Sequence, residues 1–166
     1  MVKIMSFAMS IRTVPLKAFF ENPIFLSAVS SWFMAQLIKA LIILLNGRKR
    51  NPREILAAIA WRTGGMPSSH AALVSAMATS VAFREGMGSN LFAVSFWLAL
   101  IVMRDAAGVR RSSGLQGRAL NLLGRNMADK MDVEYHPVKE VHGHAPLEVV
   151  IGALLGIFMA AAYAYL

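Results

Sequence analysis

The chain contains no cysteine among its 166 residues. A disulfide framework, a thiolate metal site and a cysteine nucleophile are therefore excluded. Acidic residues are also scarce, with nine Asp and Glu against 17 Lys and Arg, and charged residues make up only 16% of the chain. Hydrophobic residues supply 57%, a share that is high for a soluble protein and indicates a membrane protein.

The net charge of +8 does not by itself indicate a nucleic-acid-binding protein, because the basic residues gather between long apolar runs. That distribution is typical of the cytoplasmic loops of membrane proteins. We therefore expect the bilayer, and no nucleic acid, as a partner. The N-terminal apolar stretch is interrupted by Arg12 and has no clear small-residue cleavage site, which argues against a removed signal peptide.

Four apolar segments predict an all-α, integral membrane helical bundle. Three of them are long enough for a full span, since about 20 helical residues cross a bilayer core. These three are residues 24–45, 91–109 and 146–166. The fourth, residues 66–83, is shorter and begins with a polar cluster. We expect one domain over residues 1–166, with residues 1–22 as a candidate interfacial helix and short helices in the basic loops.

The loops between these segments predict an orientation. Residues 46–69 and 110–143 are rich in Arg and Lys, whereas the turn at residues 84–90 is short and balanced in charge. Basic loops tend to stay in the cytoplasm, so we expect both of them there and the short turn outside. The expected location is the cell (inner) membrane, with the polar cluster at its cytoplasmic face.

The polar cluster reads GGMPSSHAALV over residues 64–74. Ser68 or Ser69 can cap a helix, whose unpaired N–H groups and positive dipole end favour an anion. His70 then lies where it could give a proton to a group bound there. The alternative is an ordinary helix start with a surface histidine.

The last span begins GHAPLEVVIGALLG, and four of its residues recur at every fourth position. These residues are His144, Glu148, Gly152 and Gly156. Residues four apart share one helix face, and glycines on it let a neighbouring helix approach closely. A carboxylate one turn after a histidine can fix the tautomer of the ring. The alternative is a capping histidine and a glutamate whose carboxylate reaches the membrane surface.

Together these two segments resemble the phosphatidic-acid phosphatase type 2 superfamily, which includes lipid phosphatases, bacterial acid phosphatases and vanadium-dependent haloperoxidases. Residues 67–70, Pro-Ser-Ser-His, match its proline-serine-glycine-histidine motif except at the third position. His144 and Glu148 match its histidine followed four residues later by aspartate, with glutamate in its place. The chain from Gln36 onward is still more similar to a divergent branch of that superfamily. The carrying stretches are Gln36-x-x-Lys39, GGMPSSHAA at 64–72, RDAAGVRRSSGLQGRALN at 104–121 and KEVHGHAPLEVVIGALLG at 139–156.

The resemblance implies that His144 attacks phosphorus to form a phosphohistidine, with Glu148 orienting its ring. It implies that His70 protonates the leaving oxygen. The implied phosphate-binding residues in the two matching motifs and the first span are Lys39, Ser68 and Ser69. We expect Gly65 and Gly143 to support the site through their backbones.

Two parts of the parent pattern are missing. A serine-arginine pair normally precedes the nucleophilic histidine, but Pro137 and Val138 stand in those places. The arginine-proline that follows the lysine of the first motif is also absent, with Arg48 only a loose substitute. The replacement cation is therefore Lys139 or, as we favour, Arg110 or Arg111.

Asp105 has two interpretations. It pairs with Arg110 or Arg111 and holds a phosphate-binding guanidinium, or Arg104 and Asp105 simply mark the membrane boundary. We favour the first, because this stretch resembles the characteristic motif of the divergent branch.

We expect neither a metal nor a cofactor. No spacing fixes a three-ligand zinc site, and the parent superfamily needs no metal. The residues that a zinc site would have to use are His136, His142, His144, Asp132, Glu134 and Glu140.

The sequence therefore predicts a membrane phosphatase that hydrolyses a phosphomonoester or pyrophosphate headgroup of a lipid, for example phosphatidylglycerol phosphate or phosphatidic acid. The alternative is a non-catalytic membrane protein of the same fold that binds an anionic lipid or a partner helix. A channel or transporter has less support, because there are few spans and no inverted repeat. The small number of spans also allows a homo-oligomer in which a second protomer completes the site.

Overall fold

The computed structural model describes residues 16–45, 65–140 and 143–165, and every regular element in these ranges is a helix. In chain order the elements are α1 (Leu16–Phe20), α2 (Pro23–Leu45), α4 (Ser69–Glu85), α5 (Asn90–Arg104), the π-helical turn η1 (Asp105–Val109), α6 (Arg110–Met131) and α7 (Pro146–Tyr165). Within the described ranges, three helices are long and apolar enough to cross a membrane: α2, α7 and the continuous helix Asn90–Met131. The predicted all-α membrane bundle is confirmed.

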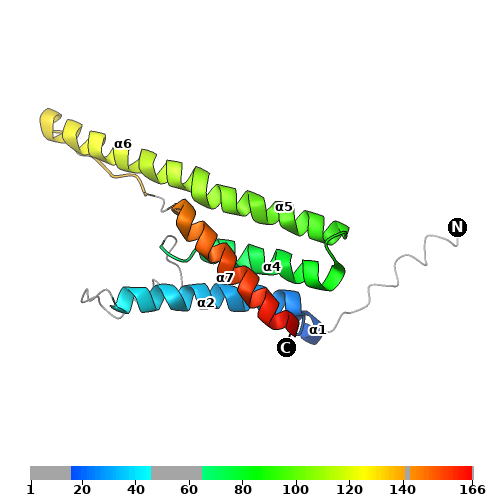
Figure 1. Ribbon diagram of the computed structural model, residues 1–166. Coiled ribbons are helices and arrows are strands. Elements are labelled where there is room, and N and C mark those ends of the chain that lie inside the picture. Colours follow the sequence, from blue (N-terminus) through cyan, green and yellow to red (C-terminus); the bar gives the residue numbers. More distant parts are fainter. Residues whose placement is uncertain (1–15, 46–64, 141–142, 166) are drawn as a thin grey trace, which may run out of the picture.

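The central helix of the bundle is α4, which packs against α2, α5 and α7 (Figure 1). Its sequence is rich in Ala and Ser, so neighbouring backbones approach it closely. Hydrogen bonds between small polar side chains add to this packing. The hydroxyls of Ser27 and Ser80 lie 2.8 Å apart, and Ser31 Oγ donates to the Ala72 carbonyl at 3.0 Å. The shortest of the four apolar segments is thus enclosed by its three longer neighbours.

The last helix, α7, crosses α4 and α2 diagonally (Figure 1). A Cβ atom on Gly152 would overlap the carbonyl oxygen of Ser68, and one on Gly156 would overlap that of Ala72. The packed face that the sequence predicts for this span therefore lies against the backbone of α4. Because Glu148 lies one turn before Gly152, the same face continues to the polar end of both helices.

The helix formed by α5, η1 and α6 is 42 residues long and extends beyond the bundle (Figure 1). The expectation of short helices in the basic loop 110–143 is wrong, because α6 alone has 22 residues. Its Gly117, Asn121 and Gly124 recur at helical spacing, and the segment 133–140 runs back along this face. The contact with segment 133–140 stabilises α6, whose glycines would otherwise weaken the helix.

The structure describes only the last part of the candidate interfacial helix 1–22. This part contains α1, whose residues are exposed. Phe19 and Phe20 pack against Phe25 at the start of α2. The placement of this helix at the membrane surface stays a prediction, as does the single domain over residues 1–166.

Replacing Gly156 with alanine should destabilise the bundle, because the new methyl group has no space beside the Ala72 carbonyl. Overpacking of this kind costs about 1–3 kcal/mol. Thermal unfolding of the purified protein in detergent would measure the effect. Gly88→Ala is the matched control, since a Cβ there meets nothing within 4 Å. Equal unfolding midpoints for the two variants would contradict the close packing of α7 on α4.

Candidate functional site

The first turn of α4 is held directly against α7. Ser68 is the N-cap, and its buried hydroxyl accepts a hydrogen bond from the Ala71 N–H at 3.4 Å. Its own N–H donates to the carbonyl of Glu148 at 2.9 Å. The cap therefore provides a hydrogen-bond partner for an otherwise unpaired N–H group at the start of α4. It also fixes this start to the polar start of α7.

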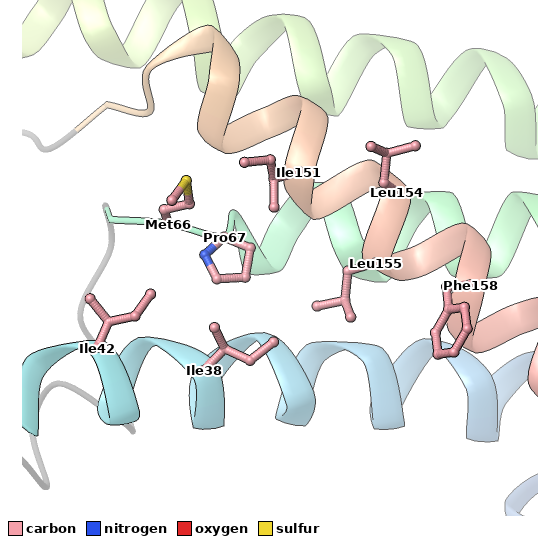
Figure 2. Close-up of a pocket in the computed structure, with 8 residues that line it drawn as sticks. All are labelled: Ile38, Ile42, Met66, Pro67, Ile151, Leu154, Leu155 and Phe158. Carbon is pink, nitrogen blue, oxygen red and sulfur yellow. The ribbon is translucent and has the colours of Figure 1, made fainter. Parts of the chain in front are cut away.

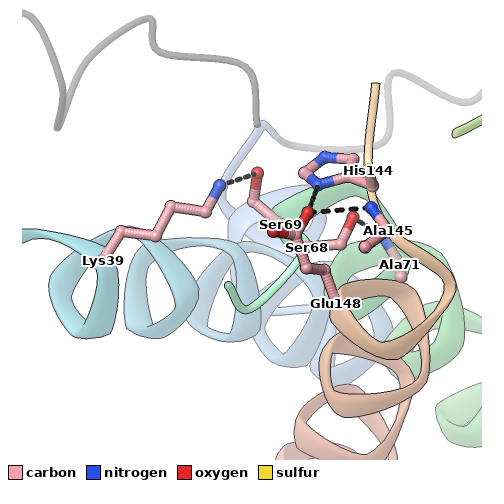
Figure 3. Close-up of polar contacts among 7 residues, drawn as sticks. All are labelled: Lys39, Ser68, Ser69, Ala71, His144, Ala145 and Glu148. Atoms are coloured by element: carbon pink, nitrogen blue, oxygen red, sulfur yellow. Dashed lines mark hydrogen bonds and ion pairs between the residues drawn. The ribbon is translucent and has the colours of Figure 1, made fainter. Parts of the chain in front are cut away.

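A buried lysine from α2 reaches this helix start (Figure 3). Lys39 is only 5% exposed, and its Nζ donates to Ser69 Oγ at 3.2 Å. The negative charge of Glu148 also acts on this ammonium group. Burying a lysine within a span is costly unless the charge is paired or used. The ammonium group and the N-terminus of α4 together form a positively charged end that suits an anion.

His144 lies just before α7 and is 2% exposed. Its Nδ1 lies 3.0 Å from Oε2 of Glu148, which also accepts the Ala145 N–H at 3.1 Å (Figure 3). Because a carboxylate only accepts hydrogen bonds, Nδ1 carries the proton and the ring lone pair is on Nε2. Glu148 thus orients the ring, and in this tautomer Nε2 is the nitrogen whose lone pair can act on a bound group.

His70 comes from the second position of α4 and faces His144. The two ring centroids are 6.4 Å apart, a separation that one phosphate group can bridge. Nδ1 of His70 is buried and has no hydrogen-bond partner in the part of the chain that the structure describes. The charges of Arg110 and Lys39 both act on this ring. Two imidazoles and two cations therefore converge at one end of the bundle.

Of the three cations considered as replacements for the missing arginine, the structure brings Arg110 to this cluster. Its Nε lies 2.6 Å from Oδ2 of Asp105, so the first interpretation of Asp105 agrees with the geometry. The remaining guanidinium N–H groups can still donate to an anion. Arg111 and Lys139 are exposed, and neither forms an ion pair with any described residue.

Both glycines expected to support the site meet backbone constraints. Gly65, just before the α4 cap, has φ of +85°, a conformation that favours glycine. Gly143 lies against the backbone of Arg110 and Arg111, where a Cβ atom would overlap main-chain atoms. Gly65 is therefore suited to its backbone conformation, whereas Gly143 is suited to a close approach to the start of α6.

Within the ranges that the structure describes, no three His, Asp or Glu residues gather as a metal site. His136 lies 3.6 Å from Glu134 in an exposed ion pair. Nδ1 of His144 is occupied by Glu148. Two residues named from the sequence, Arg48 and His142, lie outside the described residues.

The sequence profile of the Divergent PAP2 family matches residues 20–159. This chain belongs to that family. It is also 38% identical over 151 residues to the uncharacterized membrane protein YuiD of Bacillus subtilis (strain 168). The alignment covers 84% of this chain and 92% of YuiD. No solved structure matches the chain. Together with the three span-length helices, these findings identify an integral membrane protein of the Divergent PAP2 family.

Asn121, which the sequence does not single out as a site residue, forms hydrogen bonds with the segment that leads to His144. Its amide donates to the Val138 carbonyl at 3.0 Å and to Oε1 of Glu140 at 2.9 Å. Its Oδ1 accepts the Val138 N–H and the hydroxyl of Tyr135, each at 2.9 Å. A polar residue in line with Gly117 and Gly124 on α6 was the available signal.

Gln36, which enters the sequence comparison only through the stretch Gln36-x-x-Lys39, is another buried polar residue of α2. It is 5% exposed, and its Oε1 has no hydrogen-bond partner in the described part of the chain. It lies one turn before Lys39 on α2. A buried amide inside a span is costly, so its position near the lysine was a further signal of a polar site.

The pKa of Glu140 lies below its ordinary value, chiefly because the Asn121 amide donates to its carboxylate. The positive charge of Arg118, whose Nε lies 3.4 Å from Oε2, acts in the same direction. A lowered pKa means that the folded state favours the ionised carboxylate. Glu140 therefore helps to hold segment 133–140 on α6 when it is ionised.

Docking of segment 133–140 should consequently weaken in acid. The contribution of Glu140 is complete above the ordinary glutamate pKa of 4.5 and disappears as the pH falls through its lower folded pKa. Protection factors from amide hydrogen exchange in this segment, corrected for intrinsic rates, would measure the loss. In Glu140→Gln the additional loss in acid should be absent. The same decrease in both proteins would contradict the role of the carboxylate.

Proposed function

We propose that the protein is a membrane phosphatase that hydrolyses a phosphomonoester or diphosphate headgroup of a lipid. The observation that carries this proposal is the pairing of His144 with Glu148 at 3.0 Å, opposite His70 and beside the capped start of α4. The parent superfamily uses the two corresponding histidines for phosphoryl transfer, with an aspartate in the place of Glu148. Membership of the Divergent PAP2 family supports the same chemistry.

In the first step, Nε2 of His144 attacks phosphorus while the bond between phosphorus and the lipid oxygen breaks. Protonated His70 gives its proton to that leaving oxygen, which departs as an alcohol or a phosphate. Glu148 stabilises the imidazole as it becomes positive. The products are a phosphohistidine and the dephosphorylated lipid.

In the second step, water attacks the phosphohistidine and the bond between phosphorus and Nε2 breaks. His70, now neutral, accepts the proton of the water, and inorganic phosphate leaves. Positioning and charge stabilisation dominate the barrier of phosphoryl transfer, so fixed cations and N–H groups matter most. The groups proposed to hold the phosphate oxygens are Lys39, Arg110, Ser68, Ser69 and the first N–H groups of α4. His70 and the attacking water supply the protons of this scheme, and Lys39 and Arg110 supply positive charge beside the phosphate oxygens, so the scheme uses no cofactor.

An apolar groove between α2 and α7 supports a lipid as the substrate (Figure 2). It has a volume of about 370 Å³, and all the side chains that line it are apolar. The groove begins beside the site, because Ile38 directly precedes Lys39 and Pro67 directly precedes Ser68. A hydrocarbon chain attached to a phosphate in the site would fit along this wall.

We also propose that the site faces the cytoplasm across the cell membrane. The starts of α4 and α7 lie at the end of the bundle from which α6 extends (Figure 1). Lys39 contacts Ser69 at this end, Arg110 begins α6 and His144 lies just before α7. The basic helix α6 belongs to this end, and basic segments next to spans tend to remain cytoplasmic. Substrates made on that side, such as phosphatidylglycerol phosphate or phosphatidic acid, therefore fit better than a lipid carrier recycled outside.

Phosphate release from a panel of phosphates by the purified protein in detergent tests the proposal. The panel should pair long-chain lipid phosphates with short-chain, water-soluble analogues. We expect turnover, with a higher kcat/KM for the long-chain members. His144→Ala should abolish it, and Glu148→Gln should lower kcat about 10²-fold or more because the ring loses its orienting charge.

His136→Ala is the matched control, since among the described residues this exposed histidine pairs only with Glu134, and its loss should leave turnover unchanged. Full turnover by His144→Ala would contradict the mechanism. Lipid binding without hydrolysis, equal in the wild type and in His70→Ala, would instead favour the non-catalytic alternative. The absent serine-arginine pair and the glutamate in place of aspartate give that alternative its support.

A further inference from the structure

The helix that joins α5 to α6 contains one π-helical turn, η1, directly beside the site. In a regular α-helix the N–H of Arg110 would donate to the carbonyl four residues earlier, which is that of Ala106. Here it donates to the carbonyl of Asp105, five residues earlier. The carbonyl of Ala106 therefore does not receive the N–H that an α-helix would give it.

The backbone N–H of His144 uses this carbonyl instead. It donates to the Ala106 oxygen at 3.1 Å. Ala106 is 1% exposed and packs against Ala71 of α4 and Val149 of α7. The contact thus lies in the interior, where a lost hydrogen bond is not replaced by water.

Close backbone packing supports the same docking. Gly143 precedes His144, and a Cβ atom on it would overlap the main chain of Arg110 and Arg111. The segment entering the site therefore lies directly on the helix just after the π-turn. Ala106, a small and buried residue of η1, leaves the space for this approach.

The same turn also sets the position of the guanidinium group. Asp105 begins η1 and Arg110 follows it, and their side chains pair at 2.6 Å. A helix without the extra residue would turn the following residues by about 100° around its axis. One turn therefore determines both where the backbone of His144 is held and where Arg110 points.

We propose that the π-turn Asp105–Val109 is a positioning element that fixes His144 relative to Arg110 through the Ala106 carbonyl. Its importance for turnover rests on the proposed phosphatase function. The turn itself does not contact the substrate. It acts by fixing the position of the nucleophile relative to the phosphate-binding cation. Small errors in such an alignment lower the rate of reaction strongly.

Deletion of Ala107 tests this role, because it removes the extra residue and allows a continuous α-helix. We expect the amide of His144 to lose protection from hydrogen exchange, measured without any substrate. We also expect kcat to fall about 10²-fold, with a smaller change in KM, because binding groups remain while their alignment is lost.

Gly143→Ala provides a second variant if the deletion does not fold, because it keeps the π-turn and displaces only the docked segment. Gly88→Ala, where a Cβ meets nothing within 4 Å, is its matched control. Gly143→Ala should reduce both the protection of the His144 amide and kcat, whereas Gly88→Ala should change neither. Unchanged protection and kcat in the folded deletion variant, or in Gly143→Ala, would overturn the proposal.

The two measurements separate this inference from the proposed function. If the wild type releases phosphate but neither variant alters exchange or kcat, the π-turn has no positioning role. If the wild type hydrolyses no phosphate while the His144 amide responds as expected, the phosphatase assignment fails. The docking of His144 on η1 would then stand, and its role in turnover would be rejected with the activity.

Discussion

The close contact between the backbones of α4 and α7 is the constraint on which the site depends. Gly152 and Gly156 let α7 lie on the carbonyls of α4, and the Ser68 N–H then donates to the Glu148 carbonyl. A larger residue at either glycine would separate the capped helix start from the His144 and Glu148 pair. In a membrane, such contact between small residues replaces the hydrophobic effect as the main source of helix association. The glycines of α7 therefore determine both how α7 packs on α4 and how the polar starts of the two helices are placed.

Around this contact the protein holds more polar groups than a simple bundle needs. Lys39 and Gln36 are buried in α2, and His70 has a buried nitrogen without a partner in the described ranges. Keeping such groups within or beside spans is expensive. Their convergence at one end, where Arg110 is held by Asp105, is the arrangement expected of an anion site. That convergence distinguishes this end from the opposite one, where Met87 in the turn between α4 and α5 and Leu91 in the first turn of α5 are exposed apolar residues.

Much of this arrangement follows from local sequence rules. The apolar lengths predict the spans, PSSH predicts the capped helix, and the four-residue spacing from His144 to Gly156 predicts the packed face. The length of α6 could not be predicted in this way, because its glycines are covered only when segment 133–140 folds back on Asn121. The choice among Arg110, Arg111 and Lys139 could not be predicted either. It depends on the helix phase after η1, and a π-turn leaves no clear mark in the periodicity of the sequence.

In the proposed mechanism, His144, oriented by Glu148, carries the phosphate during turnover. The most direct measurement is mass spectrometry of the protein quenched rapidly in alkali, where phosphohistidine survives, during hydrolysis of a long-chain lipid phosphate. We expect one phosphate on His144, attached through Nε2, and none in Glu148→Gln at the same early time. Turnover without a phosphate on His144, or with a phosphate on another residue, would contradict it.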